Sequence, residues 1–132
     1  MRFLLRILLI AGLGFLGLQF YDYWILVVVA FAVGLLMSQR RKRRMFGKNP
    51  PAARAFLAGF LAIALLWGIW VFMIDGANAH TLSPKIFQLL TSMAEAPSYS
   101  SWAMISLTAL LGGLLGGLGA MTGNLLGEAV RG

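Results

Sequence analysis

The sequence has 132 residues, of which 60% are hydrophobic and only 11% charged, and its mean hydropathy is +0.84. A soluble domain of this length does not keep so much apolar surface in water, so the composition predicts an integral membrane protein without a separate soluble domain. The length allows about four spans of about 20 residues each. Cysteine is absent, which excludes disulfides, thiolate metal sites and cysteine nucleophiles.

The first apolar run covers about residues 3–20 and the second about residues 24–39, with the turn Tyr21-Asp22-Tyr23 between them. Both runs are short for a bilayer, so we expect either thinned lipid around this hairpin or protein neighbours that lengthen its ends. Arg2 and Arg6 at the start of an apolar run would also suit a signal peptide. However, no small-x-small cleavage site precedes the turn and a second span follows at once. The first run is therefore predicted to be a retained span, and Arg6 within it is expected to snorkel to the membrane surface.

The basic residues are unevenly distributed, which predicts the orientation. Seven of the eleven lysines and arginines fall within residues 40–54, and only Lys85 lies in the segments assigned to the other side. The positive-inside rule therefore places this loop and both termini in the cytoplasm. The loop is either a topology anchor alone or also a contact for anionic lipid, and nucleic acid is not expected because no aromatic interleaving or folded basic domain accompanies the charges. The candidate lipid-binding residues are Arg40, Arg41, Lys42, Arg43, Arg44 and Lys48.

The third apolar run covers residues 55–74 and is followed by an outer segment, residues 75–101. Within this segment Ser83 is predicted to cap a helix that starts at Pro84, because apolar residues then recur at helical spacing. This short amphipathic helix is expected to lie at the membrane interface with Lys85 and Gln88 toward water, or equally to dock onto a partner.

Asp75 and His80 are the main candidates for chemistry, because they are five residues apart around a glycine. A carboxylate beside an imidazole can form a base or half of a metal site. A lone histidine is more often a surface residue, so no catalysis, metal or cofactor is predicted. A hydrogen bond between the two inside a closed pocket would instead favour an intramembrane enzyme.

Glu128 is expected to pair with Arg131 or another basic neighbour.

The fourth apolar run, residues 102–126, is rich in glycine. At about 100° per residue its small residues fall on one side of a helix and its large ones on the other. Repeated small-xxx-small spacing predicts a helix-packing face, because small residues let helix backbones approach closely in lipid. The predicted packing residues are Ala109, Gly112, Gly116, Gly119, Ala120, Gly123 and Gly127, with a second small-residue patch at Ala55, Gly59 and Ala62 of the third run. The face could pack against the third helix, pack against another chain, or line a permeation path.

The predicted fold is therefore a single all-α membrane domain, residues 1–132, with four transmembrane helices and a short outer helix. Small four-span exporters and fluoride-type channels have chains of this length, but a central carboxylate in the first span and a polar permeation track are missing here. We therefore predict a non-catalytic accessory subunit or assembly factor of a larger membrane complex, with a homo-oligomeric channel or transporter as the alternative. The block "FLAIALLWG" followed by "GGLLGGLGA" is similar to small bacterial membrane proteins, which implies a bacterial inner membrane but no activity.

Overall fold

The computed structural model describes residues 1–38 and 51–131. These residues form five helices and no strand: α1 (Arg2–Phe20), α2 (Ile25–Leu36), α3 (Pro51–Ala77), α4 (Leu82–Thr91) and α5 (Ser100–Arg131). Helices suit a chain in lipid because each satisfies its own backbone hydrogen bonds. The all-α class predicted from the sequence is confirmed for this part of the chain.

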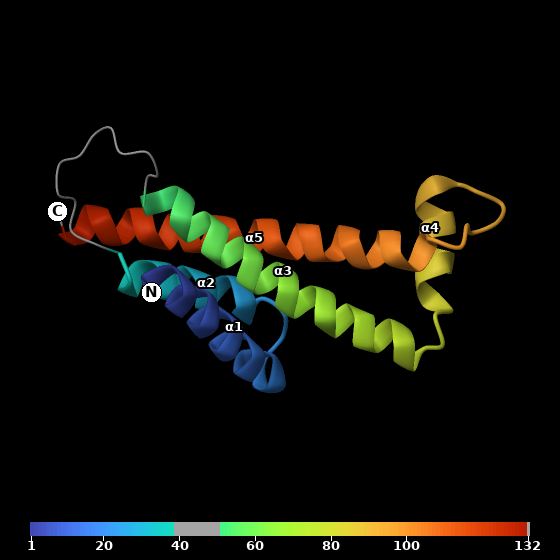
Figure 1. The fold of residues 1–132 in the computed structure, drawn as a ribbon, viewed down its shortest axis with the longest axis horizontal. Helices are drawn as coiled ribbons and strands as arrows, with labels where there is room; N and C mark the ends of the chain where they lie inside the picture. The colour runs from blue at the N-terminus through green and yellow to red at the C-terminus, as the bar shows by residue number, and fades with distance from the viewer. Residues whose placement is uncertain (39–50, 132) are drawn as a thin grey trace.

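The two longest helices, α3 and α5, run antiparallel and pack along each other, and the other helices pack against this pair (Figure 1). Helices α1 and α2 make a hairpin that packs beside one end of this pair, the end where both termini lie; we call it the terminal end (Figure 1). Helix α4 lies at the opposite end, the α4 end, and runs across the axis of α5 (Figure 1). The hairpin stops well short of α4.

Three of the described helices, α1, α3 and α5, are long and apolar enough to cross a membrane. The fourth apolar helix, α2, has only 12 residues. The sequence indicated a second span over residues 24–39, whereas the helix ends at Leu36. At 1.5 Å per residue it rises only about 18 Å, compared with about 30 Å of bilayer hydrocarbon.

Other helix boundaries follow local chemistry. Pro51 is the first residue of α3, a position where its missing N–H costs nothing. At the far end of α3 the backbone enters the left-handed region at Ala79 (φ 50°) and His80 (φ 55°), and the His80 N–H donates to the Asp75 carbonyl at 2.9 Å. Helix α4 begins at Leu82, two residues before the predicted start, and ends where Ser92 takes a φ of 55°.

The buried core lies where α1, α2, α3 and α5 meet. Most of the larger apolar side chains instead face outward, an inverted pattern that suits lipid as the surrounding solvent. The core consists of Ile10, Leu26, Ala30, Val33, Ala62, Ile63 and Ala120.

Candidate functional site: a helix-packing interface and two polar clusters

The small-residue face of α5 is buried within the chain. Ala109 is half-buried and the other six predicted α5 residues are buried. On α3 the three predicted partners Ala55, Gly59 and Ala62 are buried as well. The opposite side of α5 is exposed at its leucines and half-buried at Met121; the exposed leucines include Leu110, Leu111, Leu114, Leu118 and Leu125.

Helices α3 and α5 approach each other most closely around Gly59 and Gly116. A Cβ atom added at Gly116 would lie 2.7 Å from the Cβ of Ile63 and 2.8 Å from the carbonyl oxygen of Gly59. A Cβ added at Gly59 would lie 2.7 Å from the Cβ of Ala120. Real side chains do not approach this closely, so only glycine permits this crossing.

Gly119, Gly123 and Gly127 of the face pack on α2 and its C-terminal end, whereas Gly112 packs against the Trp67 ring of α3. A Cβ at Gly119 would lie 3.0 Å from the carbonyl oxygen of Val27, and one at Gly127 would lie 2.7 Å from that of Leu35. From the α2 side, a Cβ at Gly34 would lie 3.1 Å from the Cα of Ala120. Sequence reasoning did not weigh the second helix as a partner, although Ala30 and Gly34 have the same small-xxx-small spacing.

A polar cluster joins α1, α2 and α5 near the terminal end. Arg6 is only 8% exposed, and its Nη2 donates to the Met37 carbonyl oxygen at 2.6 Å and to Asn124 Oδ1 at 3.2 Å. Asn124 Nδ2 in turn donates to Glu128 Oε1 at 2.7 Å. The expectation that Arg6 snorkels to the surface is therefore wrong, because acceptors on two other helices hold its guanidinium inside the bundle.

Arg131 completes the same arrangement from the end of α5. Its Nη1 donates to the Ser38 carbonyl oxygen at 2.8 Å and to that of Leu36 at 3.3 Å. The last carbonyls of a helix lack intrahelical partners, and arginines near them supply the missing donors. Arg6 and Arg131 thus cap the short helix α2. Glu128, which was expected to pair with a basic residue, accepts its described hydrogen bond from Asn124.

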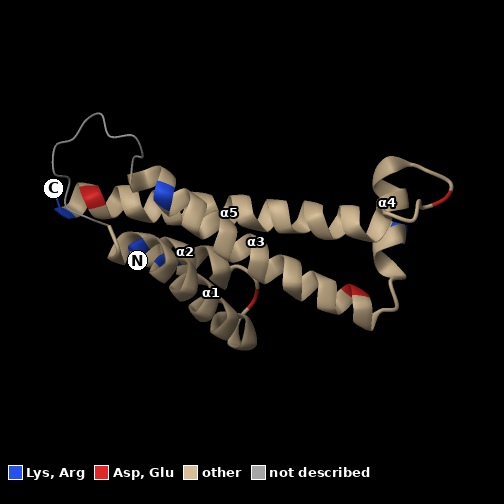
Figure 2. Cartoon of the chain, in the orientation of Figure 1, with Lys and Arg blue, Asp and Glu red and all other residues tan. Residues whose placement is uncertain are grey.

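Basic residues on the described helices gather at the terminal end, with one exception on α4 (Figure 2). The six residues predicted to contact anionic lipid, Arg40–Arg44 and Lys48, lie outside the described residues.

A second polar cluster joins the end of α3 to the start of α4. The carboxylate of Asp75, which is 3% exposed, accepts from Ser83 Oγ at 2.5 Å through Oδ1 and contacts His80 Nδ1 at 2.6 Å through Oδ2. Ser83 was predicted to be a helix cap, but its hydroxyl binds this carboxylate instead. The sequence could not show this, because the acceptor lies on another helix.

The Asp75 cluster does not have the geometry of a catalytic triad. In a triad the histidine lies between the nucleophile and the carboxylate, whereas here Ser83 and His80 both bind the carboxylate directly. The His80 side chain is 60% exposed, so the pair is within hydrogen-bond distance but not enclosed. Within residues 1–38 and 51–131, no group of three or more histidines or acids is placed to hold a metal. The cluster can anchor α4 to α3.

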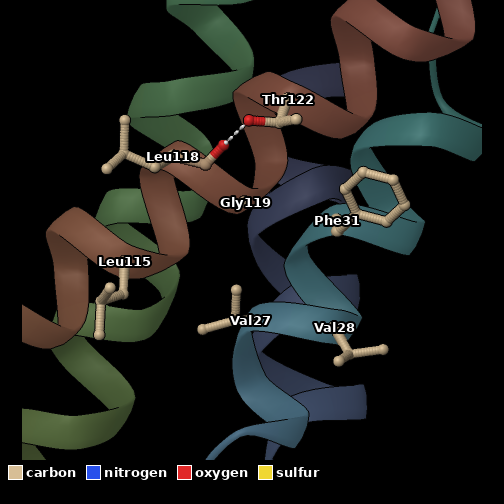
Figure 3. Close-up of a pocket in the computed structure, with 7 residues that line it drawn as sticks. All are labelled: Val27, Val28, Phe31, Leu115, Leu118, Gly119 and Thr122. Carbon is tan, nitrogen blue, oxygen red and sulfur yellow. Dashed lines mark hydrogen bonds between the residues drawn. The ribbon is translucent and has the colours of Figure 1, made fainter.

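Two shallow grooves are lined almost wholly by apolar side chains. One, of about 390 Å³, lies between α2 and α5, and its one hydroxyl, on Thr122, donates to the Leu118 carbonyl oxygen of its own helix at 2.8 Å (Figure 3). The other, of about 350 Å³, lies between α3 and α5 toward the α4 end, where the Phe72 and Trp102 rings stack 5.7 Å apart. Such linings suit acyl chains or apolar side chains better than polar substrates.

Comparisons with protein-family models, curated proteins and solved structures find no match for this chain. Its function is therefore inferred from its own geometry.

Proposed function

We propose that this chain is a non-catalytic accessory subunit or assembly factor of a larger complex in a bacterial inner membrane. In this proposal the chain crosses the membrane four times, with the terminal end and the basic loop in the cytoplasm and α4 outside. The charge distribution supports this orientation, because positive residues favour the cytoplasmic side. The chain would contribute a surface that packs against other subunits of the complex, and it would catalyse no reaction.

The observation that carries the proposal is the uncovered apolar side of α4. Ser83 and Phe87 turn toward the rest of the chain and are buried, and the Phe87 ring meets that of Tyr99 edge-on at 6.0 Å. A second side of the helix, covering an arc of about 100°, is apolar and exposed. Its residues are Leu82, Ile86, Leu89 and Leu90, of which Leu89 is 82% and Leu90 64% exposed.

Contacts at both ends of α3 attach this apolar side of α4 to the rest of the chain. The α3–α4 junction is fixed by the two contacts to the Asp75 carboxylate, and α3 is fixed to α5 by the crossing at Gly59 and Gly116. A preformed apolar face on a helix that such contacts attach loses little conformational freedom when a partner covers it, which favours a docking role. In this proposal the α5 glycines let α5 pack closely on α3, and the α4 leucines bind the partner.

The alternative of a homo-oligomeric channel receives less support. The α5 glycines that would line a path are in contact with α2 and α3. Both grooves are almost wholly apolar, so they lack the polar groups that replace the hydration of an ion. We therefore favour the subunit role.

Site-specific photocrosslinking in intact cells tests the proposal. A photoreactive amino acid at position 89 should crosslink to one protein in high yield, because Leu89 points away from the rest of the chain. The matched control is position 114, where Leu114 is exposed on the lipid-facing side of α5 and should yield mainly lipid adducts. Equal yields of lipid adducts at both positions, without a protein adduct, would refute the docking role of α4.

A further inference from the structure

The apolar helices of this molecule differ in length between the α1–α2 hairpin and the α3–α5 pair. On the side of the hairpin, α2 rises about 18 Å, whereas α3 rises about 40 Å and α5 about 48 Å, given 12, 27 and 32 residues. Helix α1, with 19 residues, rises about 28 Å along its own axis, but it is inclined to α5 and therefore reaches less far along the α3–α5 pair (Figure 1). The hairpin therefore ends at a lower level than the α3–α5 pair.

Aromatic contacts locate the tip of the hairpin against α3. The Tyr23 ring lies 6.5 Å from that of Trp67, and the Phe15 ring lies 6.4 Å from that of Trp70. Trp67 precedes the last residue of α3, Ala77, by ten residues, which corresponds to about 15 Å along the helix. The tip thus lies about 15 Å short of the end of α3.

At the hairpin tip a few polar groups lie among exposed aromatic side chains, of which Phe20 is 80% and Trp24 65% exposed. Gln19, Tyr21, Asp22 and Tyr23 are all exposed at the turn. Beyond this level α3 and α5 continue with exposed apolar side chains, including Ile69 at 59% and Phe72 at 47%. The same membrane depth therefore carries an acid and an amide among aromatic rings beside the hairpin, and mainly apolar side chains beside the α3–α5 pair.

A bilayer meets a short hydrophobic span by thinning locally, and a charged side chain at depth draws water and headgroups toward it. Asp22 provides such a charge at the tip, about 15 Å below the end of α3. We propose that the bilayer thins beside the α1–α2 hairpin and that this thinned strip accelerates the movement of phospholipids between the two leaflets. The groove between α2 and α5, which Val27, Val28 and Phe31 of the hairpin line on one side and residues of α5 line on the other, offers acyl chains a surface along this path (Figure 3).

This inference does not depend on the docking role of α4. A polar headgroup that crosses a bilayer must pass through the hydrocarbon, so a thinner hydrocarbon layer beside the hairpin lowers the barrier. Because rates depend exponentially on barriers, even a modest thinning should raise the rate by about tenfold or more. The activity requires no energy source and no selectivity for the headgroup.

The test uses the purified full-length chain in vesicles of dioleoyl phosphatidylcholine with a trace of fluorescently labelled phosphatidylcholine. Dithionite added outside bleaches only outer-leaflet label, so bleaching beyond that fraction reports transfer from the inner leaflet. We expect transfer about tenfold faster than in protein-free vesicles, and Asp22→Leu should lower it by about threefold or more. Glu95→Leu, which removes an acid from the exposed segment after α4, is the matched control and should leave the rate unchanged.

A second variant at the hairpin tip and a labelling experiment at position 22 test the same proposal. If Asp22→Leu does not reconstitute, Gln19→Leu removes a second exposed polar group from the same tip and should also slow transfer. Because the chain has no cysteine, Asp22→Cys provides a unique thiol, which should react with an impermeant maleimide added outside the vesicles. Transfer no faster than in empty vesicles would overturn the proposal. A rate unaffected by changes at the tip, or a thiol at position 22 that stays unreactive, would overturn it equally.

Discussion

The crossing of α3 and α5 at Gly116 allows the sharpest prediction about stability. Even the first carbon of a side chain at this position would lie 2.7 Å from the Cβ of Ile63 and 2.8 Å from the Gly59 carbonyl oxygen. One of these neighbours is backbone, so it cannot move aside by rotating a side chain. The two helices must separate, which breaks contacts along the whole crossing.

We expect Gly116→Ala to lower the free energy of unfolding by about 1–3 kcal/mol, the usual range for overpacking, and Gly116→Leu to exceed that range. The control is Leu114→Ala, because Leu114 is 40% exposed on the opposite side of α5 and its truncation removes mainly lipid contact. Titration of micelles with denaturing detergent, followed by tryptophan fluorescence, measures all three variants. If Gly116→Leu and Leu114→Ala unfold at the same detergent fraction, the close-packing interpretation is wrong.

Three further predictions concern the polar groups. Arg6→Met should cost about 1–3 kcal/mol of stability in the same titration, because it leaves the half-buried carbonyl of Met37 and the buried side chain of Asn124 without their donor; an unchanged midpoint would contradict this. Asp75→Asn should cost about 1.5–3 kcal/mol, because a charged acceptor shared by Ser83 and His80 is lost, and hydrogen exchange should show α4 opening first. Replacing Arg40–Arg44 by glutamine should weaken the orientation, as measured by labelling single cysteines introduced at either end; unchanged labelling would argue against the topology role of the loop.

Sequence patterns predicted what depends on neighbours along one helix. The glycine face of α5 follows from spacing within that helix, and so do the apolar runs that become α1 and α3. Patterns of this kind carry no information about which surface another helix will meet. The division of the glycine face between α3 and α2 was therefore not predicted.

The polar clusters show the same limit. Arg6 was expected to turn outward, because the carbonyl that binds it, that of Met37, is 31 residues away along the chain. Ser83 matched the local pattern of a helix cap, but the carboxylate of Asp75 competes for its hydroxyl in the folded chain. The length of α2 was overestimated for a similar reason. The apolar run continues past Leu36, but arginines from α1 and α5 satisfy the carbonyls at its end and let the helix stop there.

The measurement that most directly tests the subunit role is native mass spectrometry of the tagged chain, extracted gently from its own membrane. We expect a complex of fixed stoichiometry with a different protein, and we expect Leu89→Gln to abolish this complex while Leu114→Gln preserves it. A monomer or a pure homo-oligomer in every preparation would contradict the proposed function and make the channel or transporter alternative the better account.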